Sequence, residues 1–258
     1  MDFETVVVET ENNIGIITLN RPDQLNTFNT ALARELNQAL ADMDKDQGIR
    51  VVIIKANGRV FSAGIDVSVM PMKSIIEYRE WISDMERMSL TIANMVKPVI
   101  AAAHGVAAAN GAGLVAAADL AIVAEGTRIG TTAINVGLFC MGPAVPLSRS
   151  LGRKLSLEML LTGDFIDSEK AERIGLVNKV VPEDKLVDEA MNLATKLASK
   201  SPIALQMGKK AFYTMSDMEF EKALEYSNEM FAELCTTEDA IEGVWAFQEK
   251  RDPVWKLR

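Results

Sequence analysis

The sequence predicts an α/β protein with a mainly parallel sheet, followed by a helical C-terminal region. Short runs rich in Val, Ile and Ala alternate with longer amphipathic stretches, and this alternation is typical of strands joined by helical crossovers. The clearest strands are 51–56, 99–103 and 120–124, and the pattern from residue 183 onward is entirely helical. A chain of 258 residues is long enough for one full core with an appendage.

The first half of the chain begins with two short strands around a turn. Asn12-Asn13 are turn residues, and Asn29 is a good N-cap just before a stretch whose apolar residues fall on one helical face. In order, the predicted elements are a hairpin of strands 5–9 and 14–19, a helix over 30–44, the strand 51–56 and a long helix over 74–95.

The second half continues the alternation and then becomes helical. Gly175 is a typical helix end, Pro182 stops a strand, and Ser201-Pro202 predicts a helix start. In order, the predicted elements are the strand 99–103, a helix over 111–118, the strand 120–124, strand and loop over 127–142, short helices 143–151 and 154–162, a helix capped by Ser168, the strand 176–181 and helices to the C-terminus.

Composition and charge narrow the function classes. A net charge of −9 argues against nucleic acid as a general partner. The last twelve residues carry a net positive charge, which suits a phosphate-bearing ligand as well as it suits a solvated helix end. No apolar run is long enough for a membrane span, the start lacks a signal-peptide pattern, and two distant cysteines form no redox or metal motif. The plain expectation is a reduced, cytoplasmic protein.

In two stretches, small residues are expected to let backbone N–H groups approach a cleft. In Val-Phe-Ser-Ala-Gly-Ile-Asp (60–66), small residues follow a buried strand, and Asn-Gly-Ala-Gly (110–113) opens an Ala-rich helix. Two backbone N–H groups, one at a helix N-terminus, are the parts of an oxyanion hole, which stabilises negative charge on a carbonyl oxygen.

These stretches, with Arg-Pro-Asp-Gln-Leu-Asn (21–26), closely resemble the enoyl-CoA hydratase/isomerase (crotonase) superfamily over essentially the whole chain. The resemblance implies a ββα spiral core over 1–198, which holds an acyl-CoA site, and a helical trimerisation region over 199–258. It also implies a homotrimer or a dimer of trimers. Coenzyme A would be part of the substrate, so no separate cofactor or metal is expected.

Site residues follow from the resemblance position by position. The oxyanion donors would be the backbone N–H groups of Ala63 and Asn110, where Asn110 replaces the usual glycine. The residues expected to bind the CoA ester are Gln24, Leu25, Thr27, Gly64, Asp66, Val67, Gly111, Phe247 and Lys250.

The two usual catalytic glutamates are missing. Gly113 and Ala133 stand at their positions, and neither residue can move a proton. Each general acid–base group typically contributes about 10²–10⁴-fold to a rate, so ordinary crotonyl-CoA hydration should be very slow.

Several other residues are candidates to replace the missing glutamates. His104 is expected to be a structural hydrogen-bonding histidine, and Cys140 a buried inert thiol without an activating partner. Asp66 and Asp119 are expected to cap turns or orient loops. The remaining candidates are solvated or weakly basic groups, namely Glu77, Tyr78, Glu80, Asp84, Thr131 and Asn135.

The leading interpretation is an acyl-CoA enzyme that stabilises a thioester enolate. One alternative is a non-catalytic acyl-CoA-binding protein. Another is a different crotonase reaction: thioester hydrolysis, decarboxylation or cyclic enoyl-CoA chemistry. Dinucleotide binding at Gly111-x-Gly113 is a weak interpretation because a third glycine in register is missing.

Overall fold

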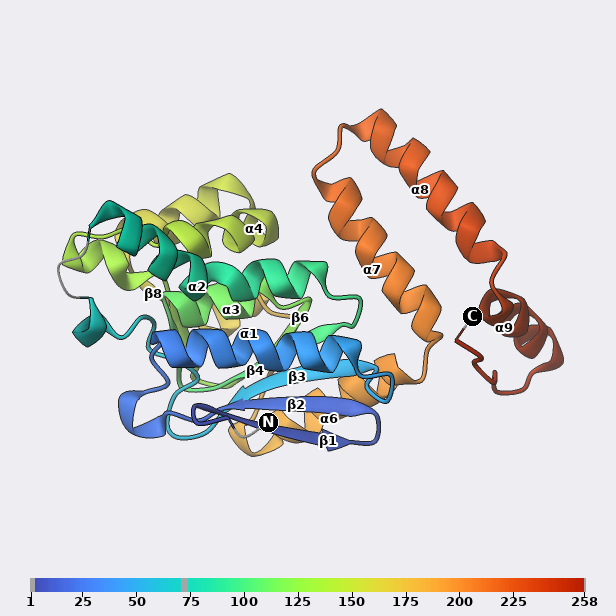
Figure 1. The fold of residues 1–258 in the computed structure, drawn as a ribbon, viewed down its shortest axis with the longest axis horizontal. Coiled ribbons are helices and arrows are strands. Elements are labelled where there is room, and N and C mark those ends of the chain that lie inside the picture. Colours follow the sequence, from blue (N-terminus) through green and yellow to red (C-terminus); the bar gives the residue numbers. More distant parts are fainter. Residues whose placement is uncertain (1–2, 71–73, 258) are drawn as a thin grey trace.

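The computed structural model of the chain describes residues 3–70 and 74–257, coloured from blue to red in Figure 1. Its strands are β1 (Val6–Glu11), β2 (Ile14–Leu19), β3 (Val51–Ala56), β4 (Val99–Ala103), β5 (Val106–Ala108), β6 (Leu120–Ala124), β7 (Arg128–Gly130), β8 (Phe165–Asp167) and β9 (Lys179–Val181). Its α-helices are α1 (Thr30–Lys45), α2 (Ile75–Asn94), α3 (Asn110–Ala117), α4 (Met141–Thr162), α5 (Ser168–Arg173), α6 (Leu186–Ala198), α7 (Pro202–Ser216), α8 (Phe220–Cys235) and α9 (Glu238–Glu249).

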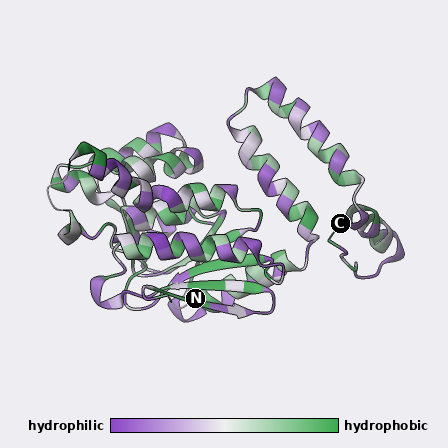
Figure 2. Ribbon diagram, in the orientation of Figure 1, coloured by the Kyte–Doolittle hydropathy of each residue, from purple (hydrophilic) through white to green (hydrophobic). Residues whose placement is uncertain are grey.

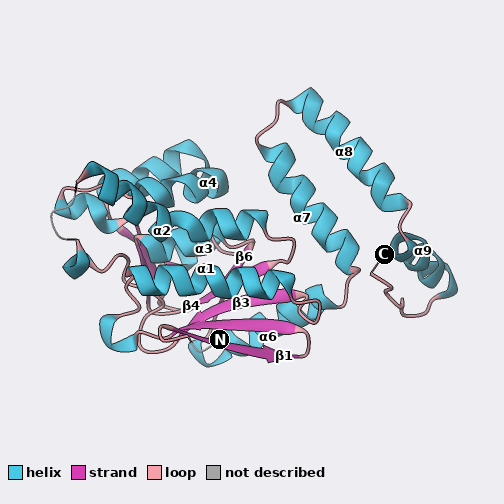
Figure 3. Ribbon diagram, in the orientation of Figure 1, coloured by secondary structure: helices cyan, strands magenta, loops and turns pink. Residues whose placement is uncertain are grey.

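The main sheet has the strand order β1-β2-β3-β4-β6-β9. Only the hairpin pair β1–β2 is antiparallel, and the four other pairs are parallel. The predicted α/β layering is therefore confirmed, with helical crossovers linking parallel strands as Figure 3 shows. A second sheet of order β5-β7-β8 lies beside it.

Helices cover both faces of the main sheet, because its central strands β2, β3, β4 and β6 are apolar and mostly buried. In β3, Val52 and Ile54 join the core formed with α1, α2 and α3, whereas Val51 and Ile53 face α6. The hydrophobic strands stand out in Figure 2 against helices that alternate between polar and apolar bands.

Local sequence signals fixed several boundaries correctly. The Asn29 side chain accepts a hydrogen bond from the Leu32 N–H at 2.9 Å and begins α1 as predicted. The Ser201 hydroxyl accepts one from the Ala204 N–H at 3.1 Å and begins α7. The predicted break between two helices falls at Gly152, where φ is +71° inside α4.

Other boundaries differ from the prediction. The strand predicted over 176–181 is only β9, because the N–H groups of Leu176 and Val177 instead bond the Ala171 carbonyl and close the turn after α5. Asp167, not Ser168, caps α5, since its carboxylate accepts a hydrogen bond from the Lys170 N–H at 2.7 Å. The strands β5 and β8, which are three residues long, were not predicted from the sequence.

The C-terminal helices α7, α8 and α9 extend away from the α/β part of the molecule (Figure 1). They carry large apolar side chains that are more than half exposed, including Phe212, Phe220, Phe231 and Phe247. Within the part of the chain that the structure describes, no helix is long and apolar enough to cross a bilayer.

Candidate active site

Hydrogen bonds hold the loop after β2 against the loop after β3. The fully buried Asn26 side chain donates to the carbonyls of Asn57 at 2.8 Å and Val60 at 3.0 Å. Its oxygen accepts from the Arg21 N–H at 2.8 Å, and its own carbonyl accepts from the Ser62 hydroxyl at 2.7 Å. An asparagine is needed there because it must both donate and accept.

Arg21 and Asp66 join the same two loops through an ion pair of 3.2 Å. The Arg21 guanidinium also donates to the Thr27 carbonyl. Asp66 accepts hydrogen bonds from the Ser68 N–H and hydroxyl, and the hydroxyl contact lowers the pKa of Asp66. Asp66 therefore orients a loop, as predicted.

The backbone N–H of Ala63 is not a free donor, which corrects the first oxyanion assignment. It donates to the Leu25 carbonyl at 3.0 Å. The Gly64 carbonyl accepts from the Phe28 N–H at 2.7 Å, so the N–H across the same trans peptide, that of Ile65, points the opposite way. Within residues 3–70 and 74–257, the Ile65 N–H has no hydrogen-bond acceptor.

The start of α3 lies directly against this loop. An added Cβ on Gly64, where φ is +101°, would lie 2.9 Å from the Cβ of Ala109, and one on Gly111 would lie 2.7 Å from the Ser62 carbonyl oxygen. Both contacts require glycine. They bring Ile65 next to the first residue of α3, Asn110, whose N–H likewise lacks an acceptor among the described residues.

The two positions that lack glutamates lie around the same helix start. Gly113 is buried one turn into α3, and an added Cβ there would lie 3.1 Å from the Pro143 ring. Ala133 lies in the 3-10 turn Thr132–Val136, and its backbone N–H contacts the Cys140 thiol. Neither position carries an ionisable side chain.

A carboxyl group that is not among the predicted site residues lies in this region. Glu86, on α2, is held by the Asn110 side-chain amide, which donates to it at 3.4 Å and to the Met85 carbonyl at 3.2 Å. On its other side the carboxyl lies over Gly142, where an added Cβ would come within 1.9 Å of Glu86 Oε2.

Burial changes the acidity of both ionisable groups here. It raises the pKa of Glu86 from 4.5 to about 7, and the Asn110 hydrogen bond opposes this shift only in part. Burial also raises the pKa of the Cys140 thiol, and the nearby Glu86 charge adds to that effect. Cys140 is therefore a protonated thiol at neutral pH, in agreement with its predicted inert character.

The other candidate substitutes have structural contacts. His104 Nε2 lies 2.8 Å from the Gly58 carbonyl oxygen, which confirms a structural hydrogen bond. Asp119 accepts from the Val99 N–H, from Lys209 Nζ at 2.6 Å and from the Tyr213 hydroxyl at 2.9 Å. It orients α7, as predicted for a positioning carboxylate.

The predicted CoA-binding residues separate into two groups. Gln24, Leu25, Thr27, Gly64, Asp66, Val67 and Gly111 belong to the two joined loops and the start of α3. Phe247 and Lys250 do not join them in one chain, because α9 lies at the far end of the C-terminal arm (Figure 1). Phe247 is 86% exposed there.

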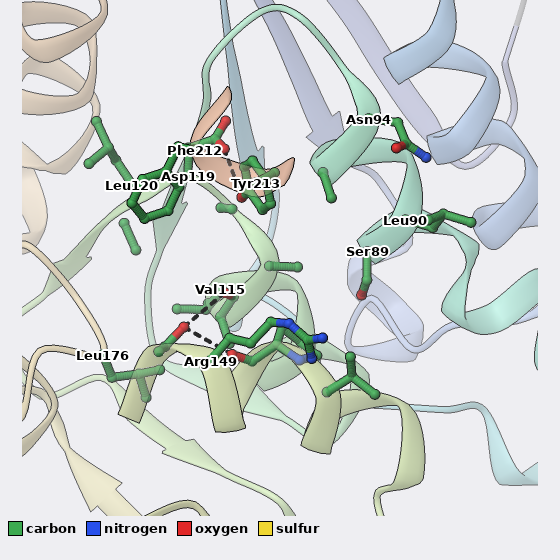
Figure 4. Close-up of a pocket in the computed structure, with 18 of the residues that line it drawn as sticks. Ser89, Leu90, Asn94, Val115, Asp119, Leu120, Arg149, Leu176, Phe212 and Tyr213 are labelled. Carbon is green, nitrogen blue, oxygen red and sulfur yellow. Dashed lines mark hydrogen bonds between the residues drawn. The ribbon is translucent and has the colours of Figure 1, made fainter. Parts of the chain in front are cut away.

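A groove of about 880 Å³ lies between α2, α3, α4 and α7. Glu86 and Gly142 border it, whereas none of the predicted CoA-binding residues lines it. In Figure 4, Ser89, Leu90 and Asn94 of α2 face Tyr213 across the groove, and a dashed line marks the Asp119–Tyr213 hydrogen bond.

The spiral of parallel strands and covering helices is the crotonase fold, as solved structures confirm. The enoyl-CoA hydratase of Mycobacterium smegmatis superposes with a TM-score of 0.94, is 36% identical, and the match covers 98% of this chain and 99% of that one. Human enoyl-CoA hydratase domain-containing protein 3 gives 0.93 at 34% identity, with 98% and 100% coverage.

Sequence comparison defines the family. The family model described as "Enoyl-CoA hydratase/isomerase" matches residues 9–258. A "Probable enoyl-CoA hydratase" of Rhizobium meliloti is 35% identical over the full length of both chains. The chain therefore belongs to the enoyl-CoA hydratase/isomerase family of enzymes.

Proposed function

We propose that the protein acts on acyl-CoA thioesters and stabilises a thioester enolate with the backbone N–H groups of Ile65 and Asn110. The observation that carries the proposal is this pair of unbonded donors, held together by glycine contacts, with one donor at a helix N-terminus. Such donors are aligned before the reaction, so they stabilise developing charge without reorganising.

The two joined loops provide the binding surface for the CoA part. Backbone of Gln24, Leu25 and Thr27 lines one side, and residues 63–67 line the other. Asp66 keeps its negative charge paired with Arg21, which holds the loops in place. Gly111 lets the start of α3 approach the thioester.

Phe247 and Lys250 would reach this site from a second copy of the chain. Their position on a protruding arm, with Phe247 exposed, supports a homotrimer or a dimer of trimers. Lys250 adds positive charge suited to a CoA phosphate.

Two-glutamate hydration is not the proposed reaction, because Gly113 and Ala133 supply no acid or base. The half-buried Glu86 carboxyl next to Asn110 favours a catalytic protein over a passive acyl-CoA carrier. Its pKa near neutrality is typical of groups that exchange protons during a reaction.

A matched pair of glycine variants tests the site. Gly64→Ala adds a Cβ that meets Ala109 at 2.9 Å and displaces the loop from α3, so calorimetric titration with butyryl-CoA should show at least about tenfold weaker binding. Gly126→Ala has a similar positive φ but nothing within 4 Å of the new Cβ, so it should bind normally. Equal affinity in both variants, or no binding by the native protein, would overturn the proposal.

A further inference from the structure

The surroundings of Glu86 distinguish it from the other carboxylates of α2. Glu77 belongs to the capping box with Ser74, Glu80 is exposed, and Asp84 forms an ion pair with Arg34 at 2.9 Å. Of these four carboxylates, Glu86 is the one that lies against the start of α3, where the Asn110 side chain donates to it.

The space for this carboxyl group depends on a missing side chain. Its three terminal atoms lie within 2.3 Å of the point that a Cβ of Gly142 would occupy. The next residue, Pro143, packs on Gly113, which occupies the position of one absent glutamate. The Glu86 carboxyl therefore lies near the first turn of α3, where an acid from α3 itself would otherwise project.

The same residue that offers the oxyanion donor also holds the carboxyl. The Asn110 N–H lacks an acceptor among the described residues, while the Asn110 side chain is bonded to Glu86 and to the Met85 carbonyl. The hydrogen bond from the Asn110 side chain therefore places the Glu86 carboxyl, which comes from α2, beside the residue that offers the backbone donor.

We propose that Glu86 is the proton-transfer residue of this enzyme, acting from α2 in place of the two missing glutamates, with Asn110 as its positioning residue. This inference rests on the proposed function. It assigns a catalytic role to a residue outside the positions that the family resemblance identified.

The proposed step moves one proton within the substrate. The Glu86 carboxylate takes a proton from the α-carbon of the thioester, and the C–H electron pair forms the carbon–carbon double bond of the enolate. The carbonyl π pair moves to the oxygen, which accepts hydrogen bonds from the Ile65 and Asn110 N–H groups. Glu86 then returns the proton to the α-carbon or, in a β,γ-unsaturated substrate, to the γ-carbon.

This chemistry determines the class of substrate. One carboxyl group can take and return a proton, but hydration with two carboxylates divides acid and base duties between them. The product of the γ-transfer is the conjugated α,β-enoyl thioester, and neither water nor an external cofactor is consumed. Return of the proton to the α-carbon only regenerates the starting thioester, so net conversion by this route requires a β,γ-enoyl-CoA as substrate.

Two assays with defined probes test the inference. Mass spectrometry in D₂O follows deuterium entry at the α-carbon of butyryl-CoA, and ultraviolet absorbance follows conversion of 3-hexenoyl-CoA to the conjugated isomer. Glu86→Gln, which keeps the shape of the side chain, should lower both rates by at least about 100-fold. Calorimetric titration should show that this variant still binds butyryl-CoA.

Glu80→Gln is the matched control because Glu80 is exposed on the same helix, and its rates should equal those of the native protein. Native rates in Glu86→Gln would overturn the inference and leave the proposed function standing. Binding without exchange or isomerisation by the native protein would also overturn it, since Glu86 would then move no proton. Absence of acyl-CoA binding would instead refute the proposed function.

Discussion

Glu86 is half-buried against Asn110 and Gly142, and the cost of removing its carboxyl from water depends on pH. Its pKa is about 7 in the folded protein against an ordinary 4.5, so the folded state binds this proton more tightly than the unfolded state. The contribution of Glu86 to the free energy of unfolding therefore falls as pH rises from about 4.5 to 7, by at most about 3 kcal/mol, and then levels off.

Glu86→Gln should remove this cost. We expect the variant to be more stable than the native protein at pH 8, by up to about 3 kcal/mol, and to gain almost nothing near pH 4. Urea unfolding at the two pH values measures the difference, with Glu80→Gln as the control. Equal gains at both pH values would contradict the raised pKa.

Several other ionisable groups lie near Glu86. The Cys140 thiol adjoins it, and the charged side chains of Asp119, Arg149, Lys210 and Asp217 line the same groove.

At the residue scale, the sequence predicted which backbone segments lie together better than which side chains lie beside them. The resemblance placed Asn110 and the loop 60–66 in one site, and the structure brings these two segments into contact. Ala63 was wrong as a donor because its N–H bonds the Leu25 carbonyl. Glu86, the residue proposed to move the proton, was not selected because it and Asp84 stand at the two edges of the buried face of α2 and the local sequence does not distinguish them. Only the tertiary structure shows that the edge with Glu86 faces α3 and that with Asp84 faces Arg34.

Among the elements, the contact between α2 and the start of α4 fixes the position of the acid. Gly142→Ala places a Cβ inside the present position of the Glu86 carboxyl, which must then swing away. A glutamate side chain moves easily and alanine favours helix, so we expect little loss of stability. Deuterium exchange into butyryl-CoA should nevertheless fall at least about tenfold.

Gly208→Ala on α7 is the control for this variant, because nothing lies within 4 Å of the new Cβ. It should leave exchange unchanged. A Gly142→Ala protein that exchanges at the native rate would show that the position of Glu86 does not matter.

The contact between α3 and α4 also limits attempts to restore hydration. The Cβ of a glutamate at position 113 would lie 3.1 Å from the Pro143 ring. Pro143 must therefore shift before the new carboxylate can point into the site. Two substitutions, at Gly113 and Ala133, therefore do not reproduce a two-glutamate site by themselves.

The sequence predicted the long elements well and the short ones poorly. The apolar runs of β3, β4 and β6 match the structure residue for residue, because buried parallel strands are continuously apolar. The strands β5 and β8 have three residues each, too few for a periodic pattern. They form only where segments that are distant in the sequence pair with each other, and the local sequence does not predict this pairing.

Across the whole molecule, a buried ion pair anchors the C-terminal arm to the α/β core. Lys209 of α7 donates to Asp119 at 2.6 Å and to the Lys97 carbonyl at 2.8 Å. Asp119→Ala would leave the ammonium buried without its charge partner, so we expect a loss of about 3–5 kcal/mol in urea unfolding. Asp217→Ala breaks only the exposed pair with Arg149 and should cost less than about 1 kcal/mol.

Similar losses in the two variants would mean that the arm is not held by Asp119. The trimer or dimer of trimers implied by the resemblance remains a prediction at this scale. Analytical ultracentrifugation of the native protein measures it directly, and a monomer would leave Phe247 and Lys250 without a role in the CoA site.

The proposed grip on the thioester consists of peptide groups alone, from Ile65 and Asn110, and peptide groups are the same whatever side chains mutate around them. Under the two proposals, the groups that bind the carbonyl oxygen and the group that moves the proton are therefore separate, and the acid can stand on a different helix while the backbone donors stay unchanged.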